Sequence, residues 1–175
     1  EKIFSPLGSI QKQLVQRIIE SQQPDYSWMD AEWDPCRQWE FGFQVLKDMG
    51  YDFEAGRQDK APHPFTISFD PNDVRITTRI QPDSIFSGLM ATIHEGGHAL
   101  YEQGLPSQYR RTPLCSVPSL GIHESQSLLW EKYIGRSRPF WEHYYPKLQS
   151  FFPDRLKRIS FEQFFQGVNR VYPSL

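Results

Sequence analysis

A His-Glu-x-x-His run at residues 94–98 constrains the fold of this chain more than any other feature. On an α-helix, side chains four residues apart lie on one face, so His94 and His98 can offer imidazole nitrogens to one metal ion. Zinc is the usual occupant of such a pair. Glu95 can orient and deprotonate a metal-bound water, the arrangement by which zinc peptidases hydrolyse amides. The pattern therefore predicts a helix through these residues.

The flanking sequence favours one long helix with the motif at its middle. Asp83 or Ser84 can cap its start and Gly104 can end it. Gly96 and Gly97 occupy two interior positions, where each costs roughly 1 kcal/mol relative to Ala. Helix propensity does not account for them, so we expect another segment or a substrate to approach closely there. The alternative is a His pair that is solvated or packed on an amphipathic helix.

A catalytic zinc needs a third protein ligand and one open position for water. We predict Glu124, which lies 26 positions after His98 in the helix-compatible stretch 122–134, because a carboxylate from a following helix commonly completes the pair. The adjacent His123 would point about 100° away on a helix and is interpreted as a packing or supporting residue. Glu131 is the alternative ligand.

Four motifs occur in a characteristic order. They are His63-Pro64-Phe65, an Asp-x-Arg-x-Thr segment at 73–77, the His-Glu-x-x-His run, and His-Glu-Ser-Gln at 123–126. This order is similar to that in the Taq-type thermostable metallocarboxypeptidases, which are zinc-dependent exopeptidases that remove C-terminal residues from peptides. The resemblance implies a helical, zincin-like metallopeptidase fold, and it implies that the fourth motif supplies the third ligand.

The resemblance extends from about Phe4 to the last residue. Members of that family are several hundred residues long, and their later Ile-Arg-x-x-Ala-Asp segment, part of the substrate site, has no counterpart here. We therefore expect residues 1–175 to be a single catalytic-core segment from the middle of a longer protein. The resemblance also implies a homodimer.

Composition agrees with a piece of a globular enzyme, because 38% hydrophobic and 15% aromatic residues can form a packed core. With 19 basic and 21 acidic side chains and no stripe of Lys or Arg, neither nucleic acid nor an anionic membrane is a predicted partner. No apolar stretch approaches about 18 residues and the N-terminus is not signal-like. Cys36 and Cys115 lack metal or redox spacing and are predicted to be free thiols rather than a disulfide. Free thiols favour a cytoplasmic location.

Hydrophobic periodicity predicts a mostly α-helical chain with a small β-hairpin beside the metal helix. Between Pro64 and Ile80, two alternating runs flank the turn-forming residues 70–73. Helices are expected at 9–21, 36–49, 84–104, 122–134, 140–152 and 160–171. The second is predicted to be capped by Asp34 and ended by Gly50, and the first to lie on the surface.

The hairpin has a predicted part in substrate binding. An edge strand beside the metal helix can hold a substrate backbone in an extended form, and we assign this to the strand of Asp73, Arg75 and Thr77. Arg75 can also pair with the terminal carboxylate of a substrate, or else form a structural pair with Asp73. His63 can contact substrate or stabilise the transition state, although a His before Pro64 is often structural.

The predicted reaction is hydrolysis of the C-terminal bond of peptides with a free C-terminus. Zn²⁺ on His94, His98 and Glu124 would activate water and Glu95 would be the general base; Co²⁺ suits the same ligands. The alternatives are a zinc-dependent oligopeptidase or endopeptidase on a similar scaffold, and an inactive metal-binding fragment. We expect slow turnover by the isolated chain, because one wall of the cleft would lie beyond Leu175, and self-association through exposed apolar faces.

Overall fold

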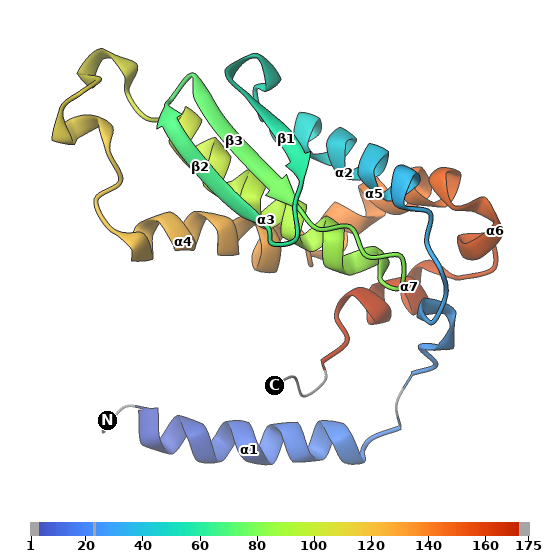
Figure 1. The fold of residues 1–175 in the computed structure, drawn as a ribbon. Helices are drawn as coiled ribbons and strands as arrows, with labels where there is room; N and C mark the ends of the chain where they lie inside the picture. Colours follow the sequence, from blue (N-terminus) through green and yellow to red (C-terminus); the bar gives the residue numbers. More distant parts are fainter. Residues whose placement is uncertain (1–3, 23, 172–175) are drawn as a thin grey trace.

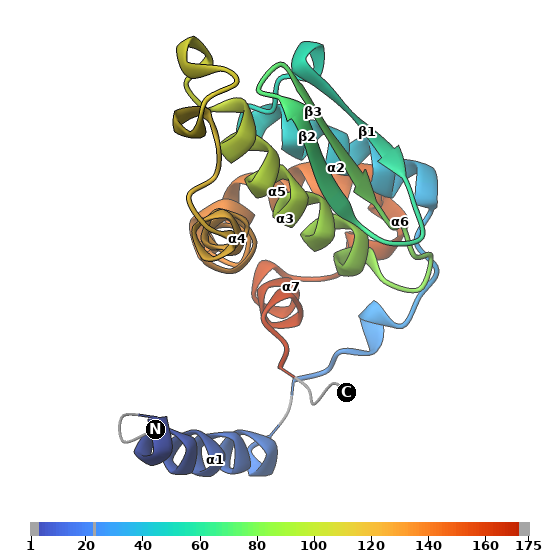
Figure 2. The same cartoon turned by 60° about the vertical axis from the view of Figure 1, so that its left-hand side comes forward.

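The computed structural model describes residues 4–22 and 24–171, and the chain there is mostly helical with one small sheet, as predicted (Figures 1 and 2). Its elements, in chain order, are α1 (Phe4–Glu20), α2 (Pro35–Met49), β1 (Gly56–Lys60), β2 (Phe65–Asp70), β3 (Asp73–Thr78), α3 (Ile85–Gln103), α4 (Leu120–Leu128), a π-helix (Leu129–Ile134), α5 (Arg138–Phe151), α6 (Pro153–Leu156) and α7 (Phe161–Val168). Short 3-10 turns occupy Ser27–Met29, Phe53–Ala55, Ser107–Tyr109 and Pro113–Cys115.

The predicted caps fix the helix boundaries. The Asp34 side chain accepts hydrogen bonds from the first turn of α2, and Gly50 ends that helix in the left-handed region with φ of 99°. Ser84 caps α3, and Ser160 with Gln163 forms a capping box at α7. The stretch predicted as one helix over 122–134 is α4 followed by the π-helix.

The sheet has the strand order β1-β3-β2, with β1 parallel and β2 antiparallel to β3 (Figure 1). The predicted hairpin is β2 and β3. Our assignment of β3 as the edge strand that meets substrate is wrong, because both of its edges are paired; the free edges belong to β1 and β2. β1 was missed because its sequence is polar, and among its residues only Gln58 is buried.

α3 is the central element, in contact with β2, β3, α2, α4 and the π-helix. Its two consecutive glycines make these contacts close. A Cβ on Gly96 would lie 2.6 Å from the Leu46 Cδ2 atom of α2, and one on Gly97 would lie 2.7 Å from the Ser127 Cα atom of α4. The expected close approach of another segment is therefore confirmed for both glycines.

An aromatic core backs the other side of α3. Trp141 is fully buried, its Nε1 donates to the Gly135 carbonyl at 2.8 Å, and its ring packs edge-on against Phe86 and Phe164 at 6.2 and 4.8 Å. Edge-to-face pairs of this kind add to the free energy gained by burial. The core thus gives the metal-motif helix a well-packed support.

α1 lies apart from this body in both views (Figures 1 and 2), and none of its residues is buried. It begins at Phe4, before the predicted start at Ser9, and is the surface helix that periodicity indicated. Cys36 and Cys115 are free thiols, as predicted. None of the described helices is long and apolar enough to cross a membrane.

Candidate metal centre

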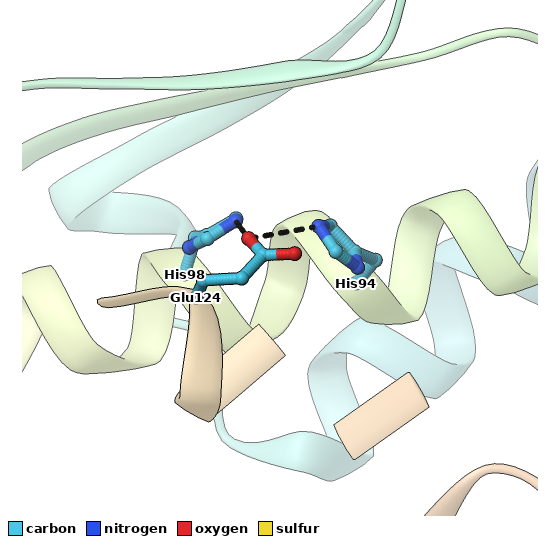
Figure 3. Close-up of side chains that lie close together, drawn as sticks. All are labelled: His94, His98 and Glu124. Carbon is cyan, nitrogen blue, oxygen red and sulfur yellow. Dashed lines mark ion pairs between the residues drawn. The ribbon is translucent and has the colours of Figure 1, made fainter. Parts of the chain in front are cut away.

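The three predicted ligands converge at one point between α3 and α4 (Figure 3). The Nε2 atoms of His94 and His98 lie 3.7 and 3.2 Å from Oε2 of Glu124, and the three candidate ligand atoms lie within 4.8 Å of one another. The close contact at Gly97 sets the separation of the two helices. The Glu124 side chain is 49% exposed, so the cluster is open to solvent.

The donor set fits a divalent cation. Two imidazole nitrogens and one carboxylate oxygen are the ligands of many catalytic zinc sites, and three protein ligands leave a position for water. His98 stacks on His123 at 4.4 Å, and Nε2 of His123 lies 3.0 Å from Oε1 of Glu102. Burial, with a contribution from the charge of His123, lowers the pKa of His98 to about 4. His98 is therefore neutral near pH 7, as a metal ligand must be.

Glu131 orients the other imidazole. Its carboxylate accepts a hydrogen bond from Nδ1 of His94 at 2.9 Å, which leaves Nε2 free to face Glu124. This bond is the largest cause that raises the pKa of His94. Burial acts to raise the pKa of Glu131, but hydrogen bonds from His94 and Lys132 lower it below its usual value. The structure thus places the alternative ligand behind His94, outside the cluster of three.

Glu95 is buried beside the cluster, and a residue of β2 holds it in place. The Thr66 hydroxyl donates to Oε2 of Glu95 at 2.6 Å. Burial raises the pKa of Glu95, and this hydrogen bond opposes part of the rise. Sequence reasoning missed Thr66 because β2 inverts the usual pattern: Phe65, Ile67 and Phe69 are exposed while the polar residues between them face inward.

The two predicted substrate residues, His63 and Arg75, are both exposed. His63 directly precedes β2; its Nδ1 atom lies 2.6 Å from the Pro64 carbonyl oxygen, and its charge acts to lower the pKa of Glu95. Arg75 is on the exposed face of β3, opposite the residues that pack on α3, and pairs with Asp73 through hydrogen bonds of 2.7 and 2.9 Å. Among the described residues, the cluster of candidate ligands includes neither His63 nor Arg75, so a substrate contact stays a prediction for both.

Known proteins have sequences and folds similar to those of this chain. The profile of the carboxypeptidase Taq (M32) metallopeptidase family matches residues 1–175. Thermostable carboxypeptidase 1 of Thermus thermophilus is 45% identical over 174 residues, which cover 99% of this chain and 34% of that protein. Carboxypeptidase 1 of Bacillus subtilis is 38% identical over 175 residues, which cover 99% of this chain and 35% of that protein. The crystal structure of an M32 carboxypeptidase from Deinococcus radiodurans R1 matches with a TM-score of 0.93 and 40% identity, over 99% of this chain and 35% of that one. The chain thus spans about a third of the length of these relatives.

Proposed function

Because this chain belongs to the carboxypeptidase Taq (M32) metallopeptidase family, we propose that it carries the zinc centre of an enzyme that hydrolyses the C-terminal bond of peptides with a free C-terminus. One observation carries the proposal: the Nε2 atoms of His94 and His98 and Oε2 of Glu124 meet at one point beside the buried Glu95. Residues 1–175 form a single catalytic-core segment in this proposal.

Zn²⁺, or Co²⁺ as a substitute, would be held by His94, His98 and Glu124, and when bound it supplies Lewis-acid polarisation of the scissile carbonyl and a lowered pKa of water. Glu95 takes the proton of the attacking water and later gives it to the leaving amine. Its raised pKa makes it a stronger base than an exposed glutamate. Because the Thr66 hydroxyl donates a hydrogen bond to Oε2 of Glu95, we assign Oε1 as the oxygen that holds the proton.

The neighbouring residues take supporting parts. Glu131 fixes the tautomer and ring orientation of His94, and His63 contacts the substrate beside Glu95. Arg75 already pairs with Asp73, so we assign it no part in the reaction. Its contact with the terminal carboxylate of a substrate stays a prediction. The family resemblance supports a homodimer, and the free thiols support a cytoplasmic location. The mixed charge supports the expectation that the protein binds neither nucleic acid nor an anionic membrane.

Two substitutions separate the ligand from the base. We expect Glu124→Ala to lose the metal, whereas Glu95→Gln should keep the metal and lose activity by several orders of magnitude, because only the latter leaves all three donors in place. Metal content is measured after dialysis, and C-terminal release is measured on residues 1–175 and on a chain extended to the length of its relatives. Glu40→Ala, an exposed change on α2, is the control. Equal metal content in Glu124→Ala and the unchanged chain would show that Glu124 is not a ligand.

Peptides with an amidated C-terminus test the specificity. A carboxypeptidase that recognises the free carboxylate should lose activity on them, whereas an oligopeptidase or endopeptidase on the same scaffold should retain it. Metal uptake without turnover, even in the extended chain, would instead identify a metal-binding helical module. The isolated residues 1–175 are expected to take up about one zinc and to release C-terminal residues slowly.

A further inference from the structure

A pocket of about 740 Å³ lies beside the proposed metal centre, between β2, the end of α3 and the loop that follows α3. Figures 1 and 2 show this loop next to the end of β2, and Nη2 of Arg110 in the loop bonds to Oδ1 of Asp70 at 2.8 Å. Thr66, which holds Glu95, lines the same pocket. The pocket therefore runs along β2 away from the reacting groups.

β2 is an edge strand, so the backbone groups on its outer side have no strand partner within residues 4–22 and 24–171 and can pair with an extended peptide. From Thr66 to Asp70 the strand spans about 14 Å, at roughly 3.4 Å per residue. A carboxypeptidase has only one residue beyond the scissile bond, which is too short to fill that length. The pocket therefore suits the residues that precede the scissile bond.

The charges that line the pocket leave one cation unpaired. Asp70 is bound to Arg110, and Glu102 is 3.0 Å from Nε2 of His123. Arg111 also lines the pocket, and it makes no hydrogen bond, ion pair or ring contact with any residue in 4–22 or 24–171. An unpaired guanidinium in such a pocket attracts a carboxylate, to which it can bond through two nitrogens.

The backbone of Arg111 is unusual as well. Its φ of 63° lies in the left-handed region, and it is the one non-glycine residue with positive φ in the described part of the chain. Thr112 closes this turn, with its backbone nitrogen and its hydroxyl 3.1 and 2.7 Å from the Tyr109 carbonyl. A disfavoured conformation that its surroundings maintain often marks a binding position.

We propose that this pocket holds the part of a peptide that precedes the scissile bond as a strand added to β2, and that Arg111 favours peptides with an acidic side chain about three or four residues before that bond. The inference rests on the proposed function and adds a substrate preference to it.

The test compares two peptides of six residues that differ only in Glu or Gln at the fourth position before the last bond. Their dissociation constants are measured by fluorescence anisotropy with zinc-loaded chain that carries Glu95→Gln to prevent turnover. We expect the Glu peptide to bind on the order of threefold to fivefold more tightly, the size of a partly exposed ion pair. Arg111→Asn should reduce this ratio to about one, since Asn tolerates the left-handed region but carries no charge.

Arg111→Lys should restore most of the preference, and Arg158→Asn, a change at another exposed arginine, should leave it intact. Equal binding of the two peptides by the unchanged chain, or no binding of either, would overturn the inference. So would loss of the Arg111 effect on C-terminal amidation, which would place the terminal carboxylate at Arg111. Metal content of the same samples reports on the proposed centre separately, so failure of that centre is distinguishable from failure of this preference.

Discussion

The pKa values of the two motif histidines, His94 and His98, shift in opposite directions because their neighbours differ. Glu131 accepts a hydrogen bond from His94 and raises its pKa, whereas burial against His123 lowers the pKa of His98 to about 4. The protonated His94 therefore stabilises the metal-free fold below pH 6.5, and this contribution is lost as pH rises through its folded pKa. The neutral His98 stabilises the fold above pH 6.5, and this contribution is lost as pH falls toward 4.

This difference predicts the proton count of metal binding. Near pH 6 only His94 carries a proton that the metal must displace, so about one proton should be released per metal rather than two. Glu131→Gln should lower the pKa of His94 and reduce this number, and should weaken metal binding about tenfold to a hundredfold. Isothermal titration in two buffers of different ionisation enthalpy measures both quantities, with Glu142→Gln as an exposed control. Release of two protons at pH 6 would contradict the assignment.

Individual site residues were predictable where the chemistry is local in sequence. The spacing of His94, His98 and Glu124 predicts a cluster that the structure brings together. Thr66 and the orienting role of Glu131 were not predictable. Each depends on how two distant segments pack. In addition, the alternation of residues in β2 predicts an exposed Thr66, because its apolar neighbours would be expected to face the core.

At the scale of elements, the contact between α3 and α4 holds the proposed ligands at their separation. A methyl group at residue 97 would collide with backbone atoms, 2.7 Å from Ser127 Cα and 2.9 Å from the Gln126 carbonyl oxygen. Backbone cannot move aside as a side chain can, so α4 would have to shift, and Glu124 with it. The geometry of the centre depends on this one missing Cβ.

We therefore predict that Gly97→Ala lowers metal affinity by at least tenfold and destabilises the fold by about 1–3 kcal/mol, the usual cost of overpacking. Gly42→Ala in α2 is the matched control, because its Cβ would meet Thr92 at ordinary contact distances of 3.6 Å and more. Zinc titration against a competing chelator and urea unfolding give the two numbers. Unchanged zinc affinity in Gly97→Ala would mean that α4 adjusts without moving its carboxylate.

The same scale shows where prediction of elements succeeded. Helices with caps, such as α2 and α7, begin within a residue or two of the expected positions because the cap is a local signal. β1 has no such signal: its polar residues pair with β3, and pairing between distant segments decided both its existence and the central position of β3.

At the scale of the whole molecule, α1 presents an apolar face that nothing in the described residues covers. Its exposed apolar side chains recur at helical spacing and are Phe4, Leu7, Ile10, Leu14, Val15, Ile18 and Ile19. Contiguous apolar surface of this kind drives association in water. We therefore expect the isolated chain to self-associate through the apolar face of α1.

Light scattering coupled to size-exclusion chromatography tests this location. Residues 1–175 should form dimers or larger species at micromolar concentration, and Ile10→Glu with Leu14→Glu should shift them toward the monomer by about tenfold in the dissociation constant. Gln11→Glu with Gln13→Glu adds the same charge to exposed polar positions of α1 and should have little effect. A monomer in the unchanged chain would show that this face does not associate.

The proposed ligands lie on both sides of the loop that walls the pocket, since His98 precedes it on α3 and Glu124 follows it on α4. A cation held by both would turn residues 99–123 into a closed ring, much as a disulfide does, and would restrict the conformations open to the loop. Unlike a disulfide, this closure is reversible and depends on cation concentration. The proposed metal ion would thus also stabilise, reversibly, the loop that lines the proposed peptide-binding pocket.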